Sequence, residues 1–317
     1  MKIQNFKISN FNTLIILFLI LVFTTLFYFS IPNIYDKYEI QKHLTEKIKK
    51  KYPFIISLSP EITYSILPKP HFRVDNTKLS FPAKDGVLEI GEAKQVDIFV
   101  SNANFFNIKK IKIKEIKIEK SDLRIDKENI KKFQELLDLK IDKTINFSDT
   151  KIYIKEDKKF KSIINLILLK KIKINYDEEG DYNILNAEGK LFNKKSEFSW
   201  KNNLSNQDVS LKLNIDSLNL NIESKSKKKG NLINSTKIQL NRSYLLQDSV
   251  YDKKNKIVNI NSQKSKVNNS NLNYTGQINL DPFYFNFDSE IEKLSLKKIY
   301  KKIIIVEQLI KNFFFGN

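Results

Sequence analysis

The chain of 317 residues contains no cysteine, two histidines and seven glycines. Without cysteine it has no disulfide framework, no thiolate zinc site and no cysteine nucleophile. His43 and His71 are too few for a multi-histidine metal centre. No two glycines lie within four positions of each other, which excludes the closely spaced glycines of G-x-G-x-x-G phosphate-binding loops and the G-x-S-x-G nucleophile elbow. The composition favours a structural or binding protein, and we expect no catalytic residue, no metal site and no cofactor.

Basic residues outnumber acidic residues, with 55 Lys and Arg against 36 Asp and Glu, so that the formal charge is +19. A charge of this size is a reason to consider nucleic acid as a partner. The lysines, however, are spread along predicted strands instead of being gathered on one helix or loop. A membrane anchor also argues against this partner, and we expect no nucleic acid among the partners.

A long apolar segment near the N-terminus predicts that anchor. No charged residue lies between Lys7 and Asp36, and residues 11–31 read FNTLIILFLILVFTTLFYFSI. As a helix, a segment of this length spans about 31 Å, which is the thickness of the hydrocarbon core of a bilayer. Pro32 is expected to end the helix. The sequence therefore predicts a single transmembrane helix over residues 11–31.

A cleaved signal peptide is the alternative interpretation of this segment. Its apolar region would span about 7–15 residues, and a small-x-small cleavage site would follow. Bulky residues occupy those positions here (FYFSIPNIYD), which favours an uncleaved anchor. Positive charge precedes the helix and charges nearly cancel after it, which predicts a cytoplasmic N-terminus over residues 1–10 and the rest of the chain beyond the membrane.

Three further segments have apolar residues at helical spacing, and they are residues 38–52, 127–139 and 294–314. Pro53 ends the first pattern. Lysines recur through the last segment, so the region 291–317 is predicted to be an amphipathic helix and not a second membrane span.

Most of the remaining chain alternates between apolar and polar residues. This period of two predicts a long antiparallel sheet, apolar on one side and rich in Lys, Asn and Ser on the other. The apolar positions change parity between Ile113 and Ile116, and again between Ile215 and Leu218. Each change indicates a bulge or a tight turn, because a shift by one residue exchanges the two faces of a strand.

Turn signals divide this alternating region. Residues 172–184 enclose DEEG between two alternating segments and predict a hairpin. The polar segments 224–230 and 261–273 are predicted to be loops. The fold class expected is therefore mainly β with a few helices: a transmembrane helix, then residues 36–140 with two amphipathic helices, then a long, curved, groove-like antiparallel sheet over residues 141–290.

Several segments follow the anchor in a characteristic order: LPKP (67–70), IGEAKQVDI (90–98), FFNIKKIKI (105–113), and strand units at 186–200 and 274–287. In this order they resemble the AsmA family of bacterial envelope proteins, most closely over residues 38–125. One departure is that Asn107 or Lys109 stands where the family has its usual glycine, although Asn tolerates turn geometry.

The resemblance implies a single-pass protein of the bacterial inner membrane, with most of the chain in the periplasm, that affects outer-membrane assembly. Larger relatives are thought to carry phospholipid along a curved β-sheet groove. An apolar sheet face has to be covered or filled, and acyl chains are one possible filling. The candidate groove residues are Ile111, Ile113, Leu218, Leu220, Phe283, Phe285 and Phe287. Each could instead be a core residue beneath a helix or a second sheet.

Basic residues close to the anchor are candidates for contact with anionic lipid headgroups. They are Lys47, Lys49, Lys50 and Lys51, and their alternative is a solvated helix face. Two other functions compete with lipid binding. The sheet could be a scaffold that binds an envelope protein through its edge strands. A tethered hydrolase would use His71, Asp75 and Asp85 for acid–base chemistry, although no recognised spacing supports it.

Overall fold

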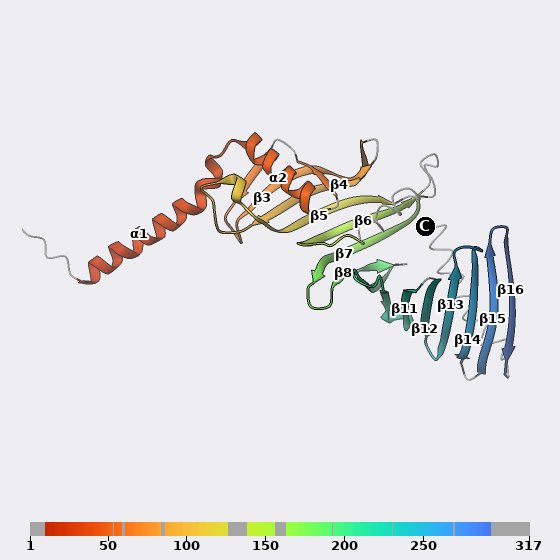
Figure 1. The fold of residues 1–317 in the computed structure, drawn as a ribbon. Coiled ribbons are helices and arrows are strands. Elements are labelled where there is room, and N and C mark those ends of the chain that lie inside the picture. The colour runs from red at the N-terminus through yellow and green to blue at the C-terminus, as the bar shows by residue number, and fades with distance from the viewer. Residues whose placement is uncertain are drawn as a thin grey trace, which may run out of the picture.

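The structure is a computed structural model and describes residues 10–52, 54–58, 61–83, 86–125, 138–155, 163–191, 193–229, 231–268 and 270–292. These residues form a long N-terminal helix followed by one large sheet, so the predicted fold class is confirmed (Figure 1).

The helical elements are α1 (Asn10–Ser30), η1 (Ile31–Ile34), α2 (Lys37–Lys51), η2 (Ile108–Lys110) and η3 (Asp216–Leu218). The strands are β1 (Ile55–Ser57), β2 (Ile62–Ser65), β3 (His71–Ala83), β4 (Gly86–Val100), β5 (Ile113–Ile125), β6 (Thr144–Lys155), β7 (Ile163–Asp177), β8 (Tyr182–Leu191), β9 (Lys194–Asn203), β10 (Val209–Ile215), β11 (Leu220–Lys229), β12 (Asn231–Leu240), β13 (Ser243–Asp252), β14 (Ile257–Val267), β15 (Ser270–Leu280) and β16 (Phe283–Ile291).

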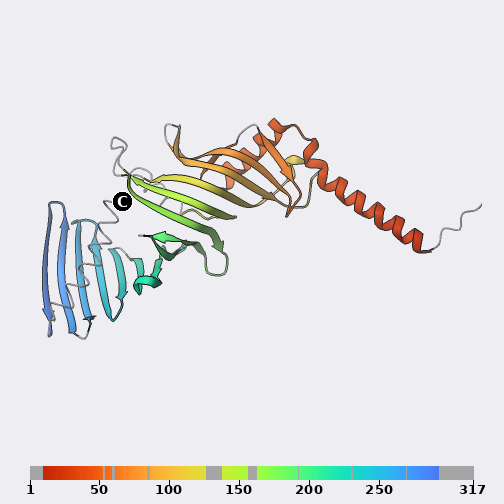
Figure 2. The same cartoon turned by 180° about the vertical axis from the view of Figure 1, so that it is seen from behind.

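Helix α1 is long and apolar enough to cross a membrane. The mean hydropathy of its best window within Thr13–Ile34 is 2.7. Its side chains between Leu14 and Phe27 are mostly exposed, so it is not a core helix of the sheet. Pro32 lies in the first turn of η1, where its missing N–H ends the α-helical ladder. The helix thus spans the predicted segment, and it projects away from one end of the sheet (Figures 1 and 2).

Helix α2 confirms the amphipathic helix expected over residues 38–52. The Asp36 carboxylate caps its first turn and accepts a hydrogen bond from the Glu39 backbone N–H at 3.1 Å. Its apolar stripe of Ile40, Leu44 and Ile48 is buried against the sheet, while the lysines of its last turn face solvent.

The sixteen strands form a single sheet that runs in chain order from β3 to β16, with β1 and β2 both paired to β3. Among the described strands, β5 and β6 pair in parallel and all other neighbours pair antiparallel. The expectation of a wholly antiparallel sheet was therefore wrong at this one point. A parallel pair needs a crossover between its strands, and residues 126–143 connect the two. The predicted helix over 127–139 falls mostly on residues 126–137, which lie outside the described residues.

The two predicted changes of parity are confirmed. The pairing of β4 with β5 shifts register at Lys114, so that Ile113 and Ile116 are both buried although their parities differ. The second change coincides with the turn η3 between β10 and β11. The predicted hairpin is also present, because β7 pairs with β8 up to Asp177 and Tyr182.

Two predicted loops are instead mostly strand. Residues 224–229 belong to β11, and residues 261–273 contribute to β14 and β15. Their Ser and Asn side chains satisfy one another by cross-strand hydrogen bonds, for example between Ser224 Oγ and Asn234 Oδ1 at 2.7 Å, so a polar composition does not prevent pairing. The predicted C-terminal helix over residues 294–314 lies outside the described residues.

Candidate functional site

The register of the sheet defines a continuous inner face. A row of apolar residues, which we call the apolar row, crosses ten strands, and each residue is paired in register with the next. Its members are Val96, Ile118, Phe147, Ile172, Ala187, Phe198, Leu213, Ile222, Ile238 and Leu245. Paired residues place their side chains on the same face of a sheet. We call the face that carries the apolar row the inner face, and its reverse the outer face.

The inner face is hollowed by a cavity of about 470 Å³ between β3 and β10. This volume lies within the range of about 300–1,000 Å³ that is typical of small-molecule sites. All but one of its lining residues are apolar, the exception being Ser196. The lining is made of Phe54, Leu79, Phe81, Ile90, Ile118, Leu123, Ile125, Ile145, Phe147, Ile152, Ile167, Leu169, Ile172, Ile174, Leu185, Ala187, Leu191, Ser196, Phe198 and Leu213. Such a lining accepts hydrocarbon and offers almost no partner to a polar group.

Helix α2 closes the end of this face nearest to the anchor. Leu44 and Ile48 of α2 belong to the same core cluster as Phe72 and Ile116 of the sheet, and all four are almost completely buried. Farther along the apolar row, Phe198, Leu213 and Ile222 are partly exposed. The inner face is therefore a packed core beneath α2 and an open trough beyond it.

The lining changes at β11. Next to the apolar row, a second row of paired residues runs through Leu185, Trp200 and Leu211, and then continues as Ser224 and Thr236. The paired residues of this second row are therefore apolar from β8 to β10 and polar from β11 onward.

Hydrogen bonds tie the polar part of this second row together. The hydroxyls of Ser224 and Thr236 lie 3.1 Å apart, and Asn234 Nδ2 donates to Thr236 Oγ1 at 3.1 Å. Farther along, Tyr274 Oη donates to Gln247 Oε1 at 2.9 Å. Burial raises the pKa of the Tyr274 hydroxyl, so this group stays a neutral donor. These groups are uncharged and largely satisfied by one another.

The last strand carries the phenylalanines that the sequence marked as groove candidates. Phe283, Phe285 and Phe287 are exposed by 72%, 64% and 43%. Phe285 pairs with Ile278 and Phe287 pairs with Gly276 on the inner face. The Phe287 ring lies over Gly276, where an added Cβ would come within 2.2 Å of Phe287 Cδ1.

The other groove candidates lie in different surroundings. Ile111 and Ile113 are each 2% exposed and belong to the core cluster near α2, and they do not line the trough cavity. Their parity matched the apolar face, but sequence could not show that a helix covers them. Leu218 lies in the turn η3, and Leu220 is half-buried beside Ile215 and Leu240.

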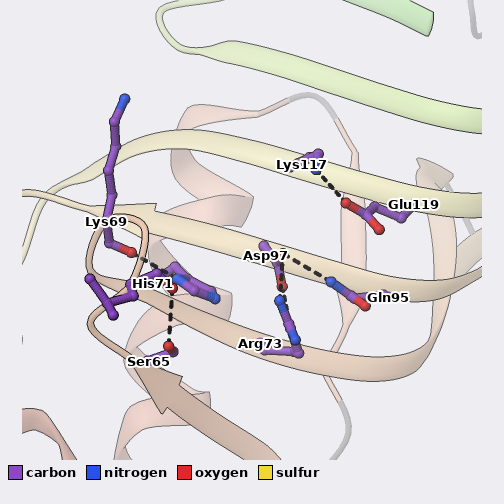
Figure 3. A network of polar contacts seen from close by, with 9 residues as sticks. Ser65, Lys69, His71, Arg73, Gln95, Asp97, Lys117 and Glu119 are labelled. Carbon is purple, nitrogen blue, oxygen red and sulfur yellow. Dashed lines mark hydrogen bonds and ion pairs between the residues drawn. The ribbon is translucent and has the colours of Figure 1, made fainter.

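The outer face of the first strands carries a polar network (Figure 3). Arg73 Nε and Nη2 donate to the two oxygens of the Asp97 carboxylate at 2.8 and 3.2 Å, and Gln95 Nε2 donates to the same carboxylate at 3.0 Å. The hydrogen bond to the Asp97 carboxylate raises the pKa of the Arg73 guanidinium. Lys117 and Glu119 form a neighbouring ion pair on the same face.

Of the residues considered for acid–base chemistry, the structure describes His71 and Asp75, and neither lines the cavity of the trough. The His71 ring is 2% exposed, its Nδ1 lies 2.8 Å from the Lys69 carbonyl oxygen, and it packs against Phe99. Asp75 is exposed on the outer face. Asp85 lies outside the described residues.

The lysine candidates separate into two groups. Lys47 and Lys51 line a small cleft together with Lys109, Lys110 and Lys112 of the loop between β4 and β5. Lys49 and Lys50 are exposed on α2 and do not line it.

Sequence reasoning did not single out the three loop lysines, nor most of the cavity lining. The dense KKIK run at residues 109–112 was the available signal for the loop. Nothing in the sequence, however, brought this run next to α2, because the two segments are far apart in the chain.

Comparison with known proteins identifies a family for the chain. No curated protein and no solved structure matches the chain. The AsmA family model matches residues 7–196, which is more than half of the 317 residues and runs from before α1 into β9. The chain therefore belongs to the AsmA family.

Proposed function

We propose that α1 anchors this protein in the bacterial inner membrane, that the sheet lies in the periplasm, and that the trough holds phospholipid acyl chains during lipid transport and outer-membrane assembly. Membership of the AsmA family supports an envelope function. The observation that carries the proposal is the cavity of about 470 Å³, lined by apolar side chains except for Ser196. Burial of each methylene stabilises the complex by about 0.8 kcal/mol, so an acyl chain needs no specific polar contact to bind.

The role proposed is non-enzymatic. The lining of the cavity has no titratable side chain, and a lipid headgroup would remain in water at the rim. Binding would then select for the length and shape of the hydrocarbon, while the polar groups that begin at β11 would weaken the hold on acyl chains farther along the sheet.

Site-specific photo-crosslinking in whole cells tests the proposal. A photoreactive amino acid at Leu213, on the rim of the cavity, is expected to label phospholipid. The same amino acid at Lys212, the next residue on the outer face, is the matched control and should label little. Equal labelling at both positions would mean that lipid reaches the sheet only from bulk membrane.

A blocking pair tests whether the cavity itself is needed. Ala187→Trp fills the cavity and should abolish labelling from Leu213, whereas Glu188→Trp adds the same ring to the exposed outer face and should not. Thermal unfolding of both variants checks that the fold is kept. If labelling survives in a folded Ala187→Trp protein, the trough is not the lipid site.

A second candidate function has its own supporting observation. Among the described strands, β16 pairs only with β15, so its other edge offers backbone groups to a further strand. The exposed rings of Phe283 and Phe285 lie on the same strand. A scaffold that binds an envelope protein by strand addition would use this edge. Crosslinks from Tyr284 to protein, with no lipid labelled from Leu213, would favour the scaffold.

A further inference from the structure

The loop between β4 and β5 (residues 101–112, the β4–β5 loop) is held against the end of α1. Tyr28 Oη donates to the Asn102 carbonyl at 3.1 Å, and Tyr35 Oη donates to the Phe105 carbonyl at 3.0 Å. The ring of Tyr28 lies 5.4 Å from that of Phe105 and 5.5 Å from that of Phe106. If α1 spans a membrane, as proposed above, these contacts place the loop at the membrane surface.

Five lysines gather at this position around a cleft of about 370 Å³. The cleft is lined by Lys47, Lys51, Asn104, Lys109, Lys110, Ile111, Lys112 and Ile113. No acidic residue lines the cleft, and within the described part of the chain none of these lysines takes part in an ion pair. Like charges that are close together and uncompensated favour an anionic partner.

Lys47 has a structural role within this cluster. Its Nζ donates to the Lys109 carbonyl at 2.8 Å and also to the Ile111 carbonyl, so that it fastens the loop to α2. Burial and the charge of Lys51 lower the pKa of Lys47. Lys51 and the three loop lysines are instead exposed, and their ammonium groups are available to a ligand.

An aromatic side chain accompanies these charges. Phe106 is 70% exposed and lies beside Tyr28, next to the end of the apolar helix. Aromatic rings are enriched where a membrane meets water, and lysines near that level are attracted to anionic headgroups. The loop thus offers a ring to the acyl boundary and cations to the phosphate level.

We propose that the β4–β5 loop and the last turn of α2 form a binding surface for anionic phospholipid headgroups of the leaflet in which α1 ends. The recognised chemistry is the phosphodiester, which the four exposed lysines surround. This surface is distinct from the cavity of the trough, whose lining is apolar except for Ser196. Binding of headgroups to the β4–β5 loop and α2 would fix the α2 end of the sheet against the bilayer.

The test uses the full-length protein in neutral detergent micelles with one reporter tryptophan. Trp200→Phe removes the natural tryptophan, and Phe106→Trp places the reporter beside the cleft. Short-chain phosphatidylglycerol is expected to change the reporter fluorescence in a saturable way, and phosphatidylcholine is expected to do so far more weakly. Replacing Lys109, Lys110 and Lys112 by Gln should weaken phosphatidylglycerol binding by about a hundredfold, from about fivefold for each lysine.

A matched control keeps the same change of charge on the outer face, far along the chain from the loop. Replacing Lys225, Lys227 and Lys237 by Gln should leave binding unchanged, because these lysines are exposed on β11 and β12. The proposal is overturned if both triple variants weaken binding equally, or if the loop variant binds as the unmodified protein does. A further titration uses inorganic phosphate. If phosphate saturates the change in reporter fluorescence at the same concentration as phosphatidylglycerol does, the cleft is a site for free phosphate and not a lipid surface.

Membrane sedimentation separates this proposal from the anchoring on which it rests. The loop variant keeps α1, so it should still sediment with membranes after alkaline extraction. Loss of headgroup binding with sedimentation intact supports the proposal, whereas failure of the unmodified protein to sediment would refute the anchoring alone.

Discussion

At the scale of single residues, Tyr64 of β2 places a hydroxyl in the core near α2. Tyr64 packs its ring against Phe72 and Phe105, with centroids 5.1 and 6.2 Å apart. Its Oη is buried and makes no hydrogen bond within the described residues. Burial raises the pKa of this phenol to about 12.

Tyr64→Phe is therefore expected to stabilise the protein by up to about 1 kcal/mol at neutral pH, because it keeps the ring and removes an unsatisfied buried group. Between the ordinary pKa of about 10 and the raised value, the folded state keeps a proton that the unfolded state loses, so the native protein loses stability as pH rises. The Tyr64→Phe variant should lose less stability as the pH rises, because it lacks this phenol. Urea unfolding at neutral and alkaline pH measures both effects, and Tyr38→Phe on an exposed ring is the control. A destabilised variant at neutral pH would contradict this account.

Gly276 is a second position where one residue determines local packing. A Cβ there would lie 2.2 Å from Phe287 Cδ1, so Gly276→Ala must displace the ring. We expect a cost of about 1–3 kcal/mol for this overpacking. In the background of Phe287→Ala the same change should cost less, since the opposing ring is gone. A double-mutant cycle by chemical denaturation measures this coupling, and strictly additive costs would show that the ring is free to move aside.

At the scale of elements, α2 begins at the capping side chain of Asp36. Asp36→Ala removes the acceptor of the Glu39 N–H and should cost about 1 kcal/mol of stability. Asp36→Asn keeps an acceptor and should recover most of that loss. Amide hydrogen exchange in the first turn of α2 locates the effect, and equal exchange in all three proteins would mean that tertiary packing alone holds the helix.

The limits of prediction also lie at this scale. The spacing of apolar residues was sufficient to predict α1, α2 and the bulge at Lys114, because each of these features depends on residues that are close together in the chain. The parallel pairing of β5 with β6 was not predictable, since it depends on a crossover between strands. Residues 261–267 of β14 were predicted to be a loop because they are polar. In the sheet such side chains find partners on neighbouring strands, and the Leu246 N–H of β13 donates to Ser265 Oγ at 2.8 Å.

At the scale of the whole molecule, the candidate site was predictable in kind but not in place. Alternation showed that one face is apolar, and register then showed which residues meet on it. Ile111 was misplaced because sequence does not show what covers a face, and the lysines at 109–112 were missed because α2 is distant in the chain. Which element covers a sheet face, and which distant segments lie close together, are tertiary properties that local sequence patterns do not determine.

The change of lining along the trough makes a prediction at this scale. If acyl chains follow the apolar row, a photoreactive amino acid at Ile238 should label phospholipid more strongly than one at Thr236, two residues away on the same strand and the same face. Both positions should label less than Leu213, which lines the cavity. Quantitative lipid labelling in cells measures the order. Equal labelling at Ile238 and Thr236 would show that polarity does not guide the chain.

The order of the strands has a consequence for how such a molecule can vary in length. From β7 to β16 every described strand pairs only with its neighbours in the chain, and all of these pairs are antiparallel. Insertion of two strands would return the chain to the same rim and lengthen the trough by about 9.6 Å, whereas one strand would leave the chain at the opposite rim. The length of the sheet can therefore change by whole hairpins while the other strands keep their pairing partners.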